Sequence, residues 1–311
     1  MANMMNALKV IRKWVVNENN YTEVADQRRP YQIDWFRVIP FVLLNLSCLL
    51  VFYVGFSWIA LITAIALVVL RVFALTGFYH RYFSHKTYKT NRFWQFTFAL
   101  IAATAAQRGP LWWASHHRQH HMVSDTIEDA HSPTQHGFWW SHFGWFLSKK
   151  NYYYNPNRVK DLLCYPELVF LDKHDILGPA LLFILMLLSG FLLQAYAPQL
   201  HTTAGKMLVW GFSISTIVTF HLTSSINSLT HVFGNRRFVT KDNSRNNFFL
   251  ALLTFGEGWH NNHHHYPATM RQGFMWWEID ITYYLLKLLE KMGIIWDVKE
   301  LPKSVLEKNR V

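Results

Sequence analysis

The amino-acid sequence predicts an all-α integral membrane protein in which four transmembrane helices form two hairpins beneath a cytosolic helical cap. Three observations lead to this fold class. Only 16% of the 311 residues are charged, whereas 51% are hydrophobic; soluble domains carry about 25% charged residues. Four apolar runs approach or reach the roughly 20 residues that cross a bilayer. The short loops that join these runs in pairs contain almost no basic residues.

The four predicted spans come in two pairs along the chain. The first pair, at about 36–53 and 58–78, is joined by residues 54–57. Because so short a loop cannot reach back across the bilayer, the two runs are expected to form a helical hairpin. Residues 177–197 and 207–226 are expected to form the second hairpin in the same way.

Charge predicts the orientation of these hairpins. Their two loops contain a single basic residue, Lys206, while most of the 30 lysines and arginines lie elsewhere in the chain. By the positive-inside tendency, both termini and the central segment face the cytoplasm. We therefore expect residues 1–35 to form a cytosolic or interfacial segment and 36–311 the membrane domain. Its cap is expected to consist of residues 79–176 and 227–311.

Three further features qualify this outline. Phe93–Ala106 is apolar but only 14 residues long, which suits a buried or interfacial helix better than a span. Met4–Val16 has the pattern of a short amphipathic helix, for which a membrane surface and an ordinary surface position are both open. Arg71 lies late in the second run and is expected to snorkel towards the interface, with a functional role as the alternative.

The charge balance and the two cysteines limit the possible partners. The net charge is +11 with histidine neutral, but no nucleic-acid motif or continuous basic stripe is present, so we expect no nucleic-acid partner. An anionic membrane surface, an anionic acyl carrier or an acidic redox protein suits this charge better. Cys48 and Cys164 are too few for a disulfide framework or a zinc knuckle.

Nine of the 17 histidines gather in four short segments, which all lie on the cytosolic side of the predicted spans. They are His80, His85, His117, His120, His121, His231, His260, His263 and His264. Histidine is the commonest metal ligand, and one metal rarely takes more than four such ligands. The clusters therefore predict two metal ions close together, and the cap is expected to hold this dimetal site.

Spacing along the chain supports convergence of these side chains. The trios at 117–121 and 260–264 both have histidines at positions i, i+3 and i+4, which share one face of a helix. Asn227 and His231 stand at i and i+4. Adjacent imidazoles diverge, so each trio is expected to serve both metals. His80 and His85 are five apart, which suits one α-helical face less well, so one of them is expected where the helix ends.

The sequence around the histidines does not identify the metal, because imidazole binds iron, copper and zinc alike. Zinc would serve hydrolysis and iron would serve oxygen chemistry, and no obvious nucleophile for hydrolysis lies nearby. Carboxylates commonly orient metal-bound histidines, and Asp125, Glu128, Asp129 and Glu257 are candidates, with solvated acids or helix caps as the alternative. The other eight histidines are expected to be non-ligands: His116, His131, His136, His142, His174, His201, His221 and His265.

The three histidine segments resemble the three boxes of the membrane fatty-acid desaturases. They read His80-Arg-Tyr-Phe-Ser-His85, His117-Arg-Gln-His-His121 and Gly256-Glu-Gly-Trp-His260-Asn-Asn-His-His264. The similarity is greatest to the delta-9 group that includes stearoyl-CoA desaturase. Asn227-x-x-x-His231 with Phe233-Gly234, and the segment from Gly137 to Trp145, match further signatures of that group. The resemblance covers roughly residues 40–267.

This resemblance implies four spans, a cytosolic cap and a di-iron centre. The nine histidines named above fall on the family's iron ligands, and Asn227 matches an asparagine that reaches one metal through water. The implied enzyme is an O2-dependent oxidoreductase, a delta-9 fatty acyl desaturase. It would use dioxygen and two electrons to insert a cis double bond into a saturated acyl chain. No catalytic residue beyond the metal site is implied, and a narrow apolar tunnel is needed to select the reacting carbons.

The resemblance also bears on the partners. Lys149 and Lys150 match a basic pair that the family uses on the coenzyme A head group, but Ser115 and His116 stand where animal enzymes carry an arginine. Acyl-CoA is therefore the expected substrate, and an acyl chain in a membrane lipid is the alternative. Electrons are expected from a separate ferredoxin or cytochrome b5-like protein with its reductase. The expected location is a bacterial inner membrane, or the endoplasmic reticulum membrane in a eukaryote.

Two other functions compete with this interpretation. A hydroxylase of the same histidine-box superfamily would abstract hydrogen at a similar centre but would insert oxygen. A metal transporter belongs to another class, and its binding site would be expected near the bilayer midplane. The predicted ligands lie outside the spans, which favours an enzyme.

Overall fold

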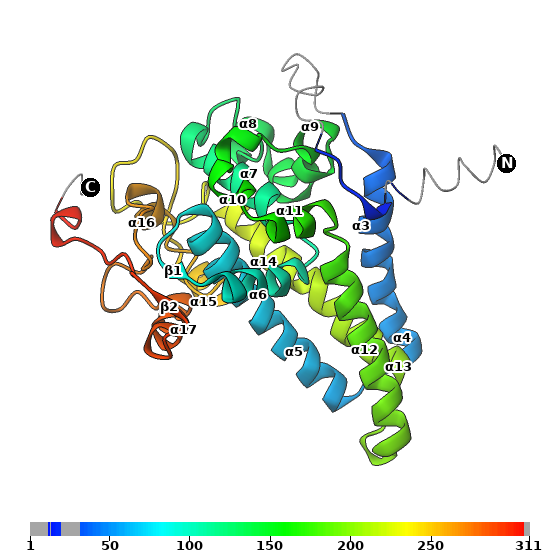
Figure 1. The fold of residues 1–311 in the computed structure, drawn as a ribbon. Coiled ribbons are helices and arrows are strands. Elements are labelled where there is room, and N and C mark those ends of the chain that lie inside the picture. The colour runs from blue at the N-terminus through cyan, green and yellow to red at the C-terminus, as the bar shows by residue number, and fades with distance from the viewer. Residues whose placement is uncertain (1–11, 13, 20–31, 308–311) are drawn as a thin grey trace.

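The computed structural model describes residues 12, 14–19 and 32–307, and most of them are helical. Most of the predicted amphipathic segment at 4–16 therefore lies outside the described residues. In Figure 1 the helical spans extend downward from a cap of shorter helices and loops. The described part contains one small sheet, in which β1 (Lys89–Thr90) pairs antiparallel with β2 (Ile295–Trp296).

Four helices are long and apolar enough to cross a membrane, as the sequence predicts. The first, Trp35–Val54, consists of α3 (Trp35–Ser47), a 3-10 turn (Cys48–Leu50) and α4 (Val51–Val54). The second, Trp58–Ser84, consists of α5 (Trp58–Phe73) and a π-helix (Ala74–Ser84). The third is α12 (Leu177–Tyr196). The fourth, Ala204–Leu229, consists of α13 (Ala204–Lys206), a π-helix (Met207–Ile214) and α14 (Ser215–Leu229).

The second and fourth helices are longer than predicted, because each continues without a break beyond its apolar run into the cap. The cap contains the remaining helices, which are mostly short. They are α6 (Arg92–Ala103), α7 (Pro110–Val123), α8 (Pro133–His136), α9 (Lys149–Tyr152), α10 (Lys160–Leu163), α11 (Pro166–Lys173), α15 (Phe248–Leu253), α16 (His260–His265) and α17 (Ile281–Lys291). Single 3-10 or π turns occupy Trp140–Gly144, Trp145–Leu147, Pro156–Arg158, Pro198–Leu200 and Lys303–Val305.

The two hairpin loops meet at the end of the molecule away from the cap. Ser57 and Thr202 share a hydrogen bond between their hydroxyl groups, and the indole of Trp210 donates to the carbonyl oxygen of Gly55. Small residues let the spans approach closely: a Cβ atom added at Gly190 of α12 would collide with the backbone of Ala204. The two hairpins therefore pack into one four-helix unit.

Two helices of the cap have clear physical boundaries. Helix α6 ends at Ala103, three residues before the end of the predicted apolar run, and Ala106 then has a positive φ of 57° that a continuing helix would not allow. Helix α7 begins with Pro110, a favoured first residue of a helix. The carboxylate of Asp172 accepts hydrogen bonds from the backbone N–H groups of Leu111 and Trp112. These two N–H groups have no acceptor within the first turn of the helix, and Asp172 supplies one.

Arg71 does not snorkel, contrary to the expectation from the sequence. Its side chain is fully buried between the second and fourth spans. The guanidinium donates to the hydroxyl groups of Thr216 and Ser215 and to the carbonyl oxygen of Thr104. These neutral acceptors satisfy its N–H groups inside the protein, so the side chain need not reach the interface.

We expect the Thr216→Val substitution to lower the free energy of unfolding by about 2 kcal/mol, because it leaves a charged N–H group buried without an acceptor. Thr219→Val is the matched control. Thr219 lies on the same helix, is equally buried, and donates only to the carbonyl oxygen of Ser215, so its loss should cost about 1 kcal/mol or less. Denaturant unfolding of both variants in detergent checks this, and equal losses would contradict it.

Candidate metal centre

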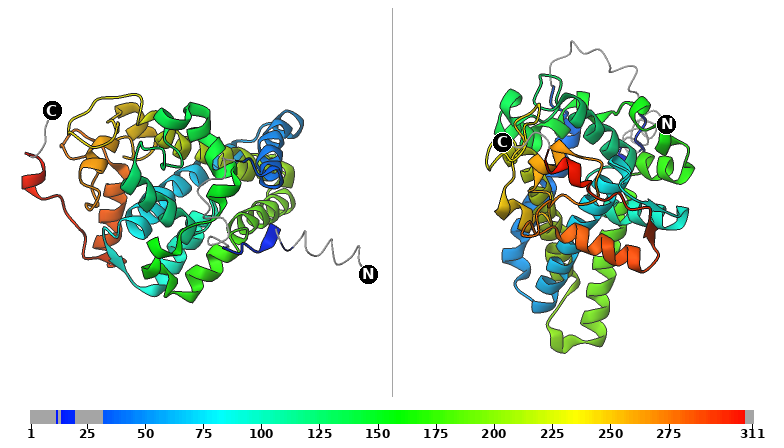
Figure 2. Two further views of the ribbon diagram at one scale, coloured as in Figure 1. Left: turned by 90° about the horizontal axis from the view of Figure 1, so that it is seen from above. Right: turned by 90° about the vertical axis from the view of Figure 1, so that its left-hand side faces the viewer.

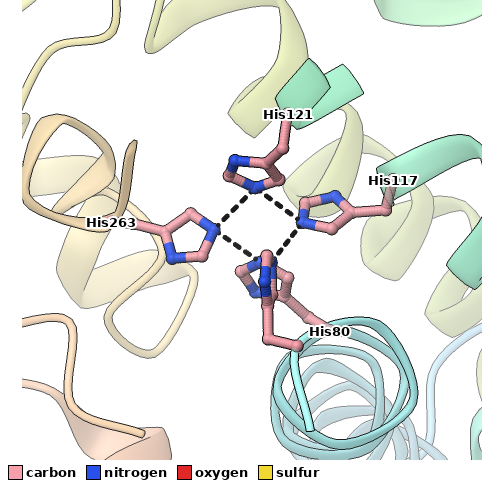
Figure 3. Close-up of side chains that lie close together, drawn as sticks. His80, His117, His121 and His263 are labelled. Carbon is pink, nitrogen blue, oxygen red and sulfur yellow. Dashed lines mark hydrogen bonds between the residues drawn. The ribbon is translucent and has the colours of Figure 1, made fainter. Parts of the chain in front are cut away.

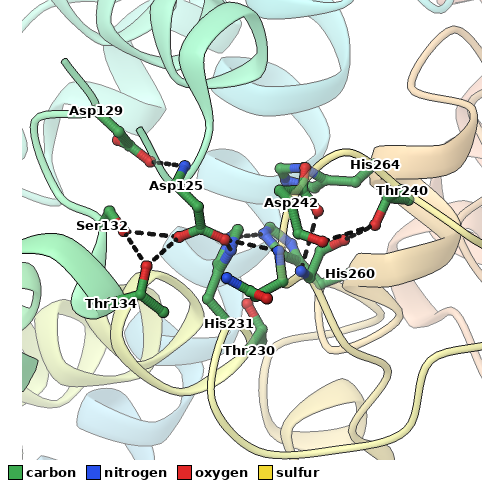
Figure 4. Close-up of polar contacts among 12 residues, drawn as sticks. Asp125, Asp129, Ser132, Thr134, Thr230, His231, Thr240, Asp242, His260 and His264 are labelled. Carbon is green, nitrogen blue, oxygen red and sulfur yellow. Dashed lines mark hydrogen bonds and ion pairs between the residues drawn. The ribbon is translucent and has the colours of Figure 1, made fainter. Parts of the chain in front are cut away.

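The nine clustered histidines come together in the cap as two adjacent groups. Group A consists of His80, His85, His117, His121 and His263, and group B consists of His120, His231, His260 and His264. Within each group, the nearest ring nitrogens all lie within 4.8 Å of one another. Figure 3 shows part of group A, and Figure 4 shows three histidines of group B with their polar neighbours.

Helical spacing divides each trio between the groups. On α7, His117 and His121 are one turn apart and face group A, while His120 faces group B. On α16 the division is reversed, since His263 faces group A while His260 and His264 face group B. Neighbouring positions on a helix point in different directions, so one helix serves two adjacent sites.

The five-residue spacing of His80 and His85 is explained by a π-helix, which the sequence analysis did not predict. Residues 74–84 form i to i+5 hydrogen bonds, the pattern that defines this helix, and the N–H of His85 donates to the carbonyl oxygen of His80 at 3.2 Å. Their ring centroids are 4.9 Å apart. His85 directly follows the last helical residue, Ser84, as expected for one member of the pair.

The imidazoles of group A point their Nε2 atoms towards a common centre (Figure 3). The Nε2–Nε2 distances are 3.0 Å between His80 and His263, 2.9 Å between His263 and His121, and 3.0 Å between His121 and His117. Burial and neighbouring charges hold the pKa values of the four group A imidazoles outside the second span well below their ordinary value. These rings are therefore neutral, the form that binds metals.

Group B leaves a metal-binding nitrogen without a partner. The Nε2 atom of His264 is buried and has no hydrogen-bond partner, while its Nδ1 contacts Asp242. The Nε2 atoms of His231 and His260 lie 3.1 Å apart. Because the contact with Asp242 places the proton of a neutral His264 ring on Nδ1, its Nε2 presents a lone pair to the centre of the group. The donor set therefore fits a metal cation.

Four carboxylates fix the outward-facing Nδ1 atoms of four of these histidines. Glu257 lies 2.6 Å from His80, Asp129 3.0 Å from His120, Asp125 2.9 Å from His231, and Asp242 2.6 Å from His264. Although burial opposes ionisation, hydrogen bonds from His231 and Ser132 hold the pKa of Asp125 well below its ordinary value. Figure 4 shows Asp125 and Asp242 on either side of the group B histidines.

One predicted carboxylate role was wrong, and one carboxylate contact was not predicted. Glu128 is exposed, and the contacts found for it are backbone contacts with Gln119 and Thr126. Asp242 was not predicted, since it lies in a polar loop 22 residues before the histidine that it contacts. It is the single acid between His231 and Phe248, but no sequence spacing relates it to a histidine.

A buried network behind group A was also missed. Glu257 contacts both His80 and Arg81, and the guanidinium of Arg81 also reaches Asp280 at 2.9 Å. All four side chains are buried. The network therefore ties the π-helix to the loops that flank α16, and Arg81 could have been noticed as a charged residue inside the first histidine segment.

Buried asparagines hold α16 in register. The side-chain oxygen of Asn261 accepts hydrogen bonds from the backbone N–H groups of Arg237 and Phe238, both at 2.8 Å. The side-chain amide of Asn262 donates to Glu278 and to the carbonyl oxygen of Gln272. The two asparagines between the histidines of this segment therefore hold α16 in a fixed position against the neighbouring loops.

Three of the histidines expected to be non-ligands lie next to the candidate ligands. His116 contacts the carbonyl oxygen of Tyr153, and His265 stacks on Phe238, so both lie outside the two groups. His131 contacts Asp129 on the carboxylate oxygen opposite the one that faces His120. Together His120, Asp129 and His131 form a third set of possible donors, but His120 already directs its Nδ1 to this aspartate.

An apolar cavity of about 700 Å³ leads to both groups. Its wall includes His80 and His117 of group A, His120 and His260 of group B, and Asn227 in the last turn of α14. Lys149 and Lys150 are not among its lining residues, although Leu147 and Tyr152 on either side of them are. An apolar molecule in this cavity would therefore lie against the histidines.

Comparison with known proteins gives one family. The model of the family described as fatty acid desaturase matches residues 56–296. The chain is 38% identical over 252 residues to an acyl-CoA C20 Delta5-desaturase of Anemone leveillei, covering 78% of this chain and 75% of that protein. It is 34% identical over 284 residues to an sn-1 stearoyl-lipid 9-desaturase of Anabaena variabilis, covering 89% and 97%. It is also 34% identical over 276 residues to the Delta-9 acyl-lipid desaturase 1 of Arabidopsis thaliana, covering 88% and 86%.

Proposed function

The chain belongs to the fatty acid desaturase family of oxidoreductases, and we propose that it inserts a cis double bond at the delta-9 position of a saturated acyl chain. One observation carries this proposal. An apolar cavity ends against two groups of converging imidazoles, four of which are fixed by carboxylates. A metal held there would face the methylene groups of a bound chain.

We propose that groups A and B each hold one iron ion. Bound iron would supply the activation of dioxygen that removal of hydrogen from an unactivated methylene requires. Overall, two C–H bonds of the chain break, and dioxygen takes up those two hydrogens with two further electrons and two protons, leaving as two waters. The protein fixes the imidazole tautomers through its carboxylates and keeps the chain in an apolar environment. Asn227, which lines the cavity, is proposed to hold a water molecule that would bind one of the metals.

The delta-9 position is supported by the motifs and by two relatives. The Anabaena variabilis and Arabidopsis thaliana 9-desaturases compared above align over 88% or more of this chain. Expression in a cell that lacks unsaturated fatty acids, followed by location of the double bond by mass spectrometry, tests the proposal. We expect a new double bond between carbons 9 and 10. A bond at carbon 5 or 7 would contradict the position, and a new alcohol without a double bond would indicate a hydroxylase.

Orientation and electron supply complete the proposal. The cap, which carries most of the basic residues, is proposed to face the cytoplasm. Electrons are proposed to come from a separate acidic protein of the ferredoxin or cytochrome b5-like kind. The net charge of +11 suits such a donor, because opposite charges steer the encounter of two proteins. Lys149 and Lys150 remain candidates for contacts with an anionic head group.

A further inference from the structure

One face of the first span forms a wall of the cavity. Phe36, Pro40, Leu43, Leu44 and Ser47 line it, and they recur at the spacing of one helical face. No residue of α3 is buried. This helix therefore separates the cavity from the surrounding lipid as a single layer.

The contacts that hold α3 in place lie towards the fourth span and the cap. Ser47 donates a hydrogen bond to the hydroxyl of Ser213 at 2.8 Å. The ring of Phe41 packs against Phe220 at 5.2 Å and against Phe146 at 5.6 Å. These contacts fix the side of α3 that faces the fourth span and the cap.

The neighbouring helix α12 also contributes to the cavity wall from its exposed surface. In Figures 1 and 2 the spans extend from the cap, and the fourth span packs against both α3 and α12. Pro179 and Phe183 of α12 line the cavity, and Phe183 is 41% exposed. Leu43 of α3 also lines the cavity and is 59% exposed. Side chains that belong both to the cavity wall and to the outer surface mark an opening between the two helices.

The depth of this opening indicates what passes through it. Trp35 and Arg37 stand at the cap end of α3, and aromatic and basic side chains commonly mark the membrane interface. Leu43 is six residues beyond Arg37 in the helix, which places it about 9 Å deeper in the membrane at 1.5 Å per residue. The opening therefore lies in the hydrocarbon layer, where acyl chains of membrane lipids are already present.

We propose that the acyl chain enters the cavity sideways from the bilayer between α3 and α12, and that the substrate is an acyl chain of a membrane glycerolipid. This inference rests on the proposed desaturase function. A lipid chain can slide through an apolar opening without leaving the hydrocarbon layer, and its head group stays at the interface. An acyl-CoA in water would have to bring its chain to the opening from outside the bilayer.

The first test compares carriers with the iron-loaded, full-length protein in phospholipid nanodiscs, supplied with a reducing system. The probes are a phosphatidylcholine with an isotopically labelled stearoyl chain and labelled stearoyl-CoA. We expect the phospholipid chain to be desaturated at least tenfold faster. Desaturation of stearoyl-CoA at an equal or higher rate would overturn the inference and leave the proposed function standing. Iron-loaded protein that desaturates neither carrier would overturn both.

The second test narrows the opening. Leu43→Trp should lower turnover of the phospholipid chain at least tenfold at unchanged iron content, whereas Leu43→Ala should keep or raise it. Ile184→Trp is the matched control, because Ile184 lies next to Phe183 and is 50% exposed but does not line the cavity. Unchanged turnover in Leu43→Trp, or an equal loss in Ile184→Trp, would overturn the lateral opening.

Discussion

Alanine at His263 or at His264 is expected to lower desaturation at least a hundredfold, whereas alanine at the adjacent His265 leaves most of the activity. The three residues are consecutive on α16 but have different surroundings. His263 belongs to group A and His264 to group B. His265 belongs to neither, and its ring stacks on Phe238. Because the three residues share one helix, His265→Ala controls for any general disturbance of α16 that His263→Ala or His264→Ala also causes.

The physical reason for the loss is the removal of a ligand from a small donor set. Group B has four imidazoles, so alanine at 264 leaves three and opens the site. We expect each of the two damaging variants to keep one iron ion more firmly than the other. Iron content by plasma mass spectrometry and double-bond formation in lipid extracts check both statements. A fully active His264→Ala protein, or an inactive His265→Ala protein with both irons bound, would contradict the assignment of the groups.

Asp129→Asn is expected to lower activity or iron affinity 10- to 100-fold, the usual effect of removing a carboxylate that orients a metal-bound histidine. The carboxylate of Asp129 is fully buried and contacts His120 on one oxygen and His131 on the other. Although burial opposes ionisation, electrostatic interaction and hydrogen bonding with these two histidines hold its pKa well below the ordinary value. An asparagine keeps the size of the side chain but removes the charge and one acceptor.

Glu128→Gln is the control for this prediction. Glu128 is the preceding residue in the chain, is exposed, and shows no contact with the histidine groups in the described structure. Its change should leave iron content and turnover within about twofold of the wild type, since surface substitutions away from such features have small effects. If both variants behave alike, the buried carboxylate does not act through His120.

Periodicity was enough to predict the spans and the division of each trio. The apolar runs gave four helices close to their observed positions, because a span must satisfy its backbone internally and present apolar side chains to lipid. The i, i+3, i+4 spacing of the two histidine trios placed them on helix faces. These features depend on residues close together in the chain.

Features that depend on distant contacts were not predicted. One local feature, the π-helix before His85, was not predicted either, because sequence spacing alone does not distinguish it from an α-helix that ends early. The contact of Asp242 with His264 joins a loop to a helix, and no local pattern marks it. Arg71 was expected at the interface, but its acceptors come from Thr216, Ser215 and Thr104, which only the packed structure brings together.

The central claim, that two iron ions occupy groups A and B, is tested most directly by X-ray diffraction from crystals of the iron-loaded protein at the iron absorption edge. We expect two anomalous peaks, one among the Nε2 atoms of group A and one beside the Nε2 of His264 in group B. A single peak, or a peak among His120, Asp129 and His131 in place of group B, would contradict the account.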